Sequence, residues 1–347
     1  MFIRKLSVTN IRSHVEYELN LGEYTSIITG NNGSGKTSLL EALYLSQRGS
    51  SFKGTDQDML RTDAPWWRIS VQQDDMSNRT ITYDPSRTTG KKQFVSSQKT
   101  KNYRLPVKDK YPVVLFEPED LRLLSGSPAR RRKFIDEFIS QIDPTYQTSI
   151  RKYERALRQR NNLLKQPSTT NNSLFVWNVM LAEYGSLIIK KRQEAIQYIN
   201  INLTEQYQSI AKKDDNIESE YSYKAEYNQN QQLLKDLEQS VQRDKQLGYT
   251  SIGPHRHDVF FLLNNSPAIS TASRGEVRTI LLALKIQEIN QIFTLLNKKP
   301  LVLLDDIFSE LDTDRQANIE AAIKDHQVVM TSTHRLHTNE GVRHTQL

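Results

Sequence analysis

A glycine-rich loop near the start of the chain carries the residue types that bind a nucleoside triphosphate. Residues 30–37 match the pattern G-x-x-x-x-G-K-[ST] in full. In such a loop the backbone N–H groups surround phosphate oxygens, the lysine reaches the β- and γ-phosphates, and the threonine hydroxyl binds Mg²⁺. We therefore expect Lys36 to bind phosphate and Thr37 to bind Mg²⁺. The residues expected to bind ATP in this loop are Gly30, Asn31, Asn32, Gly33, Ser34, Gly35, Lys36 and Thr37.

Two consecutive aspartates follow an apolar run late in the chain. Residues 301–304 read Leu-Val-Leu-Leu, which is typical of a buried strand, and Asp305 and Asp306 come directly after them. A carboxylate is costly to bury unless a metal, a base or the surface is close. Beside a phosphate-binding loop, we expect Asp305 to hold Mg²⁺ opposite Thr37 and Asp306 to polarise the attacking water. The alternative is a pair of solvated acids at the end of a strand.

A third segment, Ser273-Arg274-Gly275-Glu276, opens a stretch with apolar residues at helical spacing. Ser273 and Glu276 have the types and spacing of a capping box, which stabilises the first turn of a helix. The tetrad also resembles the S-x-G-Q signature of ATP-binding-cassette ATPases. That resemblance implies that Ser273 and Gly275 contact the γ-phosphate of ATP bound by a second subunit. The two interpretations are compatible.

Two smaller features fit the same class of ATPase. Residues 309–312, shortly after the aspartates, resemble the D-loop that such ATPases place at their dimer interface. His334 follows a predicted strand at 328–330, in the position of a histidine that senses the γ-phosphate. A lone histidine is usually structural or exposed to solvent, but imidazole is also a natural hydrogen-bond donor to phosphate. We expect His334 to act in catalysis with Asp306.

Strands and helices must position these residues. A β-rich run at 24–28 precedes the glycine-rich loop, and a helical pattern at 38–43 follows it. The loop and the signature segment lie near opposite ends of the chain, so a large insertion separates them. We therefore predict an α/β protein with an ATPase head of the ABC type, formed by residues 1–115 plus 251–347.

The insertion, residues 116–250, is predicted to be a mainly helical arm. A strongly basic helix covers 144–166, a polar turn follows, and a second helix begins near residue 174. Together these two helices predict an αα-hairpin. One further amphipathic helix is expected at 228–247.

Composition sets limits on location and partners. The chain has 347 residues, of which 37% are hydrophobic and 25% charged, and it has no cysteine. The absence of cysteine excludes disulfides and thiolate metal sites and suits a cytoplasmic location. We find no apolar run of about 18–20 residues and no amino-terminal signal pattern, so we expect no membrane partner. The net charge of +7 indicates a mild preference for polyanionic partners.

Three segments carry a resemblance to a known family. Residues 118–136, 303–312 and 9–14 are similar to characteristic segments of the RecF family, which are recombination mediators among the SMC-like ABC ATPases. The resemblance covers nearly the whole chain. It implies an ATPase head with a helical arm, a homodimer that forms on ATP, and binding to DNA at gaps and single-strand/double-strand junctions. It also implies RecR and RecO as partners that help to load recombinase.

Two groups of basic residues are candidates for DNA contact. The first group is Arg130, Arg131, Arg132 and Lys133, and the second is Arg151, Lys152, Arg155 and Arg158. The alternative is that the first group only begins a helix and the second is a solvated helix face. The sequence contains no RNP, zinc-finger or helix-turn-helix pattern. Binding is therefore expected to be driven by phosphate contacts, sensitive to salt and weakly specific for sequence.

Two positions depart from the family pattern. Residues 253–258 read Gly-Pro-His-Arg-His-Asp, with His257 where the family has an acid, which predicts a weak or pH-sensitive contact at this position. Glu276 stands where the signature has glutamine. A carboxylate close to a γ-phosphate repels it unless Glu276 turns back to cap its own helix.

Other functions explain less of the sequence. A transporter ATPase subunit has a much shorter gap between the loop and the signature, and a P-loop kinase leaves the aspartate pair and His334 unexplained. The open alternatives are a slow, DNA-stimulated ATPase and a DNA-binding module that senses ATP without meaningful turnover. Because Asp306 is one methylene shorter than the usual catalytic glutamate, we expect turnover on the order of a few per minute or less.

Overall fold

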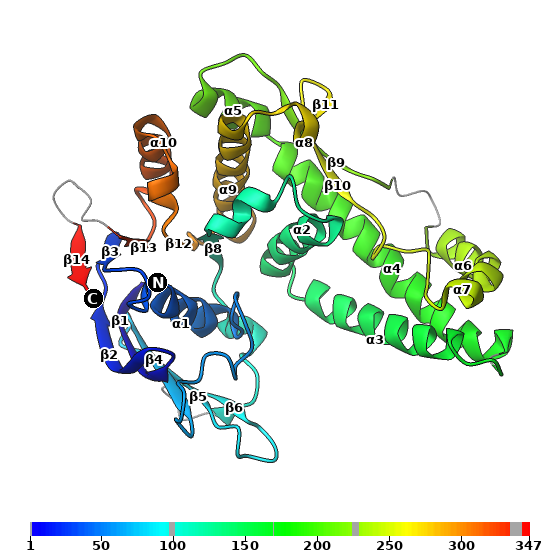
Figure 1. Cartoon of the computed structure of the whole chain (residues 1–347), viewed down its shortest axis with the longest axis horizontal. Coiled ribbons are helices and arrows are strands. Elements are labelled where there is room, and N and C mark those ends of the chain that lie inside the picture. Colours follow the sequence, from blue (N-terminus) through cyan, green and yellow to red (C-terminus); the bar gives the residue numbers. More distant parts are fainter. Residues whose placement is uncertain (1, 97–100, 169, 224–228, 334–341) are drawn as a thin grey trace. The chain divides into compact units, whose positions relative to one another are not determined.

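The computed structural model describes residues 2–96, 101–168, 170–223, 229–333 and 342–347. The chain divides into two compact units (Figure 1). Unit 1 comprises Met1–Asp120 with Ile292–Leu347, and unit 2 comprises Leu121–Gln291. The boundaries between an ATPase head and an arm that the sequence suggests stay a prediction.

A parallel sheet in unit 1 carries the segments expected to bind nucleotide. Its strands are β3 (Thr25–Thr29), β8 (Val113–Phe116), β12 (Leu301–Leu304), β13 (Val328–Ser332) and β14 (Arg343–Gln346). Their order is β14-β3-β13-β12-β8, and every neighbouring pair is parallel. β3 precedes the glycine-rich loop, β12 precedes the two aspartates, and β13 lies between these strands. The carboxyl ends of the three strands therefore meet at one edge of the sheet, where ligands bind in α/β folds.

A six-stranded antiparallel sheet completes the β structure of unit 1. Its strands are β1 (Ile3–Ile11), β2 (His14–Asn20), β4 (Trp67–Gln73), β5 (Asn78–Tyr83), β6 (Lys92–Ser96) and β7 (Lys101–Asn102), in the order β2-β1-β4-β5-β6-β7. Burial alternates along β4, with Trp67, Ile69 and Val71 facing inward. This period of two is what a half-buried strand requires.

One hydrophobic core joins the two sheets of unit 1 to helix α1 (Lys36–Arg48). It includes Leu6 of β1, Leu39 and Leu43 of α1, Trp67 of β4 and Leu303 of β12. The packing of α1 on this core fixes the position of its first turn, which follows the glycine-rich loop. The remaining elements are α10 (Thr313–Ile323) and the short 3₁₀ turns Val107–Asp109, Pro118–Arg122 and Ile307–Glu310.

Unit 2 is mainly helical. Its helices are α2 (Pro128–Ile142), α3 (Tyr146–Leu164), α4 (Asn171–Asn200), α5 (Leu203–Ala211), α6 (Gln229–Gln239), α7 (Val241–Leu247), α8 (Ala268–Thr271) and α9 (Arg274–Leu296), whose last turn lies in unit 1. The predicted hairpin is present as α3 and α4, which pack along each other (Figure 1). α4 is longer than its partner because apolar residues continue in step through Ile188, Ile196 and Ile199, all buried. The single helix predicted at 228–247 is two helices, α6 and α7, which meet at Ser240.

A small antiparallel sheet also belongs to unit 2. It contains β9 (Ile217–Tyr221), β10 (Val259–Leu263) and β11 (Ser266–Pro267), in the order β11-β10-β9. The hairpin between β10 and β11 turns through Asn264 and Asn265, which both have positive φ. Asparagine tolerates this conformation better than most residues. The sheet brings residues 253–258 back against the helices of unit 2.

Helix α9 is the one element among the described residues that is long and apolar enough to cross a membrane by composition. Within the structure, 72% of that apolar window is buried. Burial of this kind is typical of the core helix of a folded protein.

Candidate nucleotide site

The glycine-rich loop adopts the backbone that its glycines allow. Gly33 and Gly35 have φ of 83° and 97°, in the left-handed region that favours glycine. A Cβ added to Gly35 would lie 2.3 Å from His14 Nε2, and the His14 ring lies 3.2 Å from Gly35 O. The loop therefore tolerates no side chain at this position. Residues 30–35 lead from β3 into the amino end of α1, which is the order of elements in a P-loop.

Lys36 is buried at the first turn of α1, with 4% of its surface exposed. Its Nζ donates to Gly30 O at 2.7 Å and to Asn31 O at 3.2 Å. The carboxylate of Asp306 lies 3.9 Å away. The lysine thus bridges the P-loop backbone and one of the two aspartates, and its charge lies inside the loop where a phosphate would bind.

Thr37 and Asp305 meet across two elements that are far apart in the sequence. The Thr37 hydroxyl donates to Asp305 Oδ1 at 2.9 Å, and the Thr331 hydroxyl at the end of β13 donates to the same oxygen at 3.0 Å. Asp305 is 7% exposed, and burial raises the pKa of its carboxyl, while the two hydroxyls act in the opposite direction. A buried carboxylate beside a threonine hydroxyl is an oxygen donor set that suits Mg²⁺.

Asp306 adopts an unusual backbone conformation beside Thr331. Its φ is 49°, in the left-handed region, and its N–H donates to the Thr331 hydroxyl at 2.9 Å. Thr331 therefore contacts both aspartates. Sequence reasoning missed Thr331, because a threonine within a β-rich run carries no signal until the order of the strands is known.

Metal binding here would need a ligand with its own oxygens. Within the described residues, no group of three or more His, Cys, Asp or Glu side chains is placed to hold a metal ion. Mg²⁺ usually keeps several waters and binds through one or two protein oxygens plus substrate phosphates. Thr37 and Asp305 fit that requirement.

The signature segment in unit 2 forms the predicted capping box. Ser273 N and Ser273 Oγ both donate to Glu276 Oε2 at 2.9 Å, and Glu276 N donates to Ser273 Oγ at 3.3 Å. Lys213 Nζ lies 2.8 Å from Glu276 Oε1. These partners, Lys213 first, lower the pKa of Glu276 to about 2. The carboxylate is thus turned back on its own helix.

Two other expected site segments are only partly described. His334 lies outside the described residues. Of residues 309–312, Leu311 is buried, and the Asp312 side chain accepts from Arg315 N at 3.0 Å as the N-cap of α10. The side chain of Asp312 also pairs with the Arg315 guanidinium. Asp312 therefore has a structural role at the start of α10.

The first group of basic residues is not uniformly exposed. Arg131 is 8% exposed, and its guanidinium pairs with Asp258 at 2.8 Å and donates to Leu124 O and Gly126 O. These contacts correct the expectation that Arg131 binds DNA, because its donors are used inside unit 2. Arg132 donates to His257 O at 2.6 Å, and Lys133 lies exposed beside Glu137.

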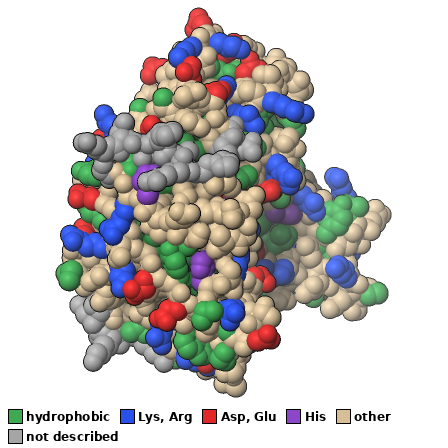
Figure 2. Space-filling model, turned by 60° about the vertical axis from the view of Figure 1, so that its left-hand side comes forward, with side chains coloured by type: hydrophobic (Ala, Val, Ile, Leu, Met, Phe, Trp, Pro, Cys, Tyr) green, Lys and Arg blue, Asp and Glu red, His purple; other side chains and the backbone are tan. Residues whose placement is uncertain are grey.

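The second group lies on an exposed face of α3. Arg151, Lys152, Arg155 and Arg158 are all exposed. Lys152 Nζ lies over the Tyr184 ring at 5.0 Å. On the face of the molecule in Figure 2, basic and acidic side chains are interspersed. Whether these residues contact DNA stays a prediction.

Arg160, next along α3, has a structural role. Arg160 and Asp244 are both 0% exposed and pair at 2.7 Å. Asn178, Thr250 and Leu237 O accept three further hydrogen bonds from the guanidinium. A buried pair is tolerated when its other hydrogen-bonding groups are satisfied in this way.

Residues 253–258 connect the helices of unit 2 to its sheet. Because His255 Nε2 faces Thr250 O at 3.1 Å, it must donate, and Nδ1 then accepts from the Tyr153 hydroxyl at 2.7 Å. His257 stacks on Tyr223 and lies 2.8 Å from the Tyr221 hydroxyl. Burial lowers the pKa of each histidine to about 4. Asp258 makes the ion pair with Arg131, whereas His257 lies against two tyrosines.

One more ion pair involves α1, the helix that follows the P-loop. Arg12, with φ of 45°, pairs with Glu41 of α1, which is fully buried. The Ser51 hydroxyl also donates to Glu41. This pair joins the end of β1 to α1, and the spacing of the two residues in the sequence gave no sign of it.

The parallel sheet, the P-loop and the paired aspartates define an α/β P-loop ATPase head. A family model described as an AAA ATPase domain matches residues 1–251. The head domain of Smc, solved bound to the C-winged helix domain of ScpA, shares this fold, with a TM-score of 0.54 and 13% identity over 96% of this chain and 90% of that chain.

Closer relatives define the family. The DNA replication and repair protein RecF of Natranaerobius thermophilus is 34% identical over 92% of this chain and 87% of its own length. The protein of the same name from Streptococcus agalactiae is 34% identical over 96% of this chain and 92% of its own length. A solved structure of the recombination mediator protein RecF with ATP has a TM-score of 0.86 and 27% identity, over 97% of this chain and 93% of that chain. The chain belongs to the RecF family of DNA replication and repair proteins.

Proposed function

We propose that this chain binds ATP with Mg²⁺ and that ATP brings two copies together to form a DNA-binding dimer in recombinational repair and replication. The contact between Thr37 and Asp305, 2.9 Å across two distant segments, carries the proposal. It places the P-loop hydroxyl beside the aspartate that follows β12, as Mg²⁺-dependent nucleotide binding requires. A relative of similar fold was solved with ATP and is described as a recombination mediator of the RecFOR pathway.

The P-loop residues would hold the nucleotide through their own groups. The backbone of residues 30–35 and the Lys36 ammonium would bind phosphate oxygens, and the dipole of α1 favours negative charge at its start. Thr37 and Asp305 would hold Mg²⁺, which neutralises charge on the phosphates. Asp306 would orient a water, with its backbone fixed by Thr331. His334 is proposed as a further polar group of this site.

A second copy would complete the site. Ser273 and Gly275 would reach the γ-phosphate of ATP bound by the partner copy, from the start of a helix. The capping box ties Glu276 to Ser273, and the ion pair with Lys213 would compensate the charge of its carboxylate near that phosphate. The head from 1–115 plus 251–347 would supply both surfaces, and the arm from 116–250 would extend from it.

DNA is the proposed polyanionic partner. The exposed residues Arg151, Lys152, Arg155 and Arg158 are favoured over Arg131 as phosphate contacts, because the donors of Arg131 are used internally. RecR and RecO are proposed as protein partners, since a solved relative is described as part of the RecFOR pathway. A cytoplasmic location follows from these partners.

Sedimentation tests the proposal directly. The mass of the protein would be measured with Mg²⁺ and ATP, ADP or no nucleotide, beside Lys36→Met. We expect a dimer with ATP alone, and a monomer for the variant in all conditions. A monomer of the natural protein with ATP, in the presence and absence of DNA, would contradict the composite site.

The second candidate is a module that senses ATP without meaningful turnover. Asp306 favours it, because this side chain is one methylene shorter than glutamate. Asp306→Ala separates the two functions. A slow ATPase would give dimers of longer lifetime in the variant, whereas a module would give the same dimer lifetime and the same DNA affinity.

A further inference from the structure

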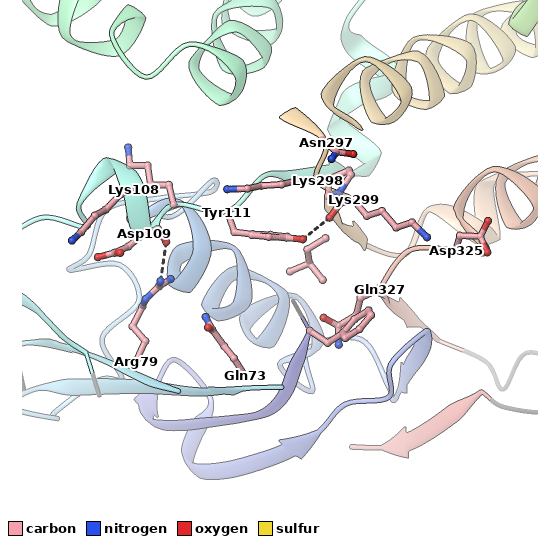
Figure 3. Close-up of a pocket in the computed structure, with 14 residues that line it drawn as sticks. Gln73, Arg79, Lys108, Asp109, Tyr111, Asn297, Lys298, Lys299, Asp325 and Gln327 are labelled. Atoms are coloured by element: carbon pink, nitrogen blue, oxygen red, sulfur yellow. Dashed lines mark hydrogen bonds between the residues drawn. The ribbon is translucent and has the colours of Figure 1, made fainter. Parts of the chain in front are cut away.

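A cationic pocket lies in unit 1 at the amino ends of the parallel strands (Figure 3). Its volume is about 530 Å³. It is formed mainly by the segments that lead into β8, β12 and β13, together with parts of β4 and β5. No residue of this pocket belongs to the nucleotide site described above.

The pocket has an excess of positive charge. Five cationic residues line it, against the two carboxylates of Asp109 and Asp325. The five are Arg79, Lys108, Lys110, Lys298 and Lys299. Among the described residues, Lys108, Lys298 and Lys299 make no ion pair, and all three are exposed. In Figure 3 the Lys298 side chain extends above Tyr111 toward the segment that carries Lys108 and Asp109.

The framework under these lysines is held by hydrogen bonds, of which those between Gln327 and Ile3 are buried. The Tyr111 hydroxyl donates to Lys299 O at 2.8 Å, and Arg79 donates to Asp109 O at 2.8 Å and to Ser46 O at 2.6 Å (Figure 3). Gln327, 5% exposed, accepts from Ile3 N at 2.9 Å and donates to Ile3 O at 2.7 Å. The backbone that presents the lysines is thus positioned before any ligand binds.

The pocket lies at the amino ends of the parallel strands, and the P-loop lies at their carboxyl ends. The P-loop follows the carboxyl end of β3, and Asp305 follows the carboxyl end of β12. Tyr111, Pro300 and Gln327 precede the amino ends of β8, β12 and β13. Since a strand rises about 3.3 Å per residue, the four residues of β12 separate the two edges by roughly 10 Å.

We propose that this pocket binds a compact polyanion with two or more phosphate groups, at a site separate from the nucleotide at the P-loop. A phosphate group carries up to about two negative charges and three strong acceptor oxygens, and lysine ammonium groups bind it as point charges. Two sources share this chemistry: a free polyphosphate compound and the phosphodiester backbone of a nucleic acid.

The test uses the full-length chain with Lys36→Met as background, so that the P-loop lysine does not contribute. Titration calorimetry at low salt measures binding of inorganic tripolyphosphate. We expect Lys298→Gln with Lys299→Gln to weaken binding by about tenfold or more, as expected when charged hydrogen bonds are removed. The matched control, Lys165→Gln with Lys235→Gln, removes two exposed lysines of unit 2 and should leave the affinity unchanged.

Further measurements identify the source of the phosphate. If a short duplex DNA, but not tripolyphosphate, loses affinity and about two units of salt slope in the pocket variant, the ligand is a nucleic-acid backbone. Equal affinities of the pocket variant and the control for both probes would overturn the proposal. Binding of a polyglutamate peptide with no binding of either phosphate probe would also overturn it. Thermal midpoints of all variants should agree, because the four lysines are exposed.

Discussion

The P-loop in unit 1 and the signature segment in unit 2 are the two halves of the proposed composite site, and they are held in different ways. Lys36 and Asp305 are almost fully buried and are fixed by short contacts to the backbone and to two hydroxyls. Ser273 is exposed, and Glu276 is held by a capping box and by exposed Lys213. The half that would hold the nucleotide is formed in the interior, whereas the half that would sense it depends on surface contacts.

This difference has an energetic consequence. A buried polar group that loses its partner keeps its full desolvation cost, whereas an exposed ion pair contributes about 0.2–1 kcal/mol. Changes at the P-loop should therefore abolish nucleotide binding, and changes at the signature should adjust dimer formation.

The largest effect is expected for Asp305→Ala. It should weaken Mg²⁺-dependent ATP binding by about 100-fold, because one partner of a buried polar pair is lost. The nucleotide-free protein should lose about 1–3 kcal/mol in its free energy of unfolding, because the hydroxyls of Thr37 and Thr331 lose their acceptor. Equilibrium dialysis with ATP and urea unfolding measure the two quantities. Ser273→Ala should behave differently and bind ATP as a monomer with unchanged affinity. A loss of ATP binding in this variant would contradict the proposed difference between the P-loop and the signature segment.

Acid should destabilise unit 2 through its buried histidines. The pKa values of His255 and His257 are about 4 in the folded protein, against about 6.5 when unfolded. The unfolded chain therefore binds more protons between pH 6.5 and 4, so stability falls as the pH falls through this window. After allowance for partial exposure, we expect a loss of about 1–2 kcal/mol per histidine.

Urea unfolding at pH 7 and pH 5 measures this effect, and His257→Asn should reduce it. The titration of Asp305 in unit 1 should change the stability in the opposite direction. Because its pKa is raised, its folded form binds a proton more readily, and its contribution to stability improves as the pH falls. If His257→Asn leaves the pH dependence unchanged, His257 is not the titrating group.

A smaller effect, on dimerisation, is expected from the exposed ion pair between Lys213 and Glu276. Lys213→Ala should weaken ATP-dependent dimerisation by up to about fivefold, because the Glu276 carboxylate loses its compensating charge near the proposed γ-phosphate. Glu276→Gln should restore dimerisation in the Lys213→Ala background and change little alone. Sedimentation at several protein concentrations measures the dimer constants. Equal losses in the single and double variants would show that Lys213 acts in another way.

The smallest change is expected on the exposed face of α3. Arg155→Ala with Arg158→Ala should leave stability within about 0.5 kcal/mol and lower the salt slope of DNA binding by about two. DNA affinity at several salt concentrations measures the slope. An unchanged slope would remove this face from the DNA-binding surface. Arg131→Ala, in contrast, should destabilise the protein, because it leaves Asp258 half-buried without its partner.

Much of the nucleotide site could be predicted because its signals are local. The P-loop, the strand before it and the helix after it are contiguous, and each residue type has one physical task there. The capping box of Ser273 and Glu276 was predicted for the same reason, since its two members are three residues apart. Thr331 and Lys213 were not predicted, because their contacts depend on strand order and on a loop far away in the sequence.

By itself the sequence determined the P-loop, the aspartate pair after an apolar strand, the α/β class and the resemblance to a family. Each of these depends on neighbouring residues or on periodicity. Only the tertiary structure decided which arginines are available to a ligand. Arg131 pairs with Asp258, 127 positions along the chain, and Arg160 pairs with Asp244, whereas Arg155 and Arg158 on the same helix as Arg160 stay exposed. The physical reason is that burial and pairing are set by which distant segments meet, and no local pattern records that.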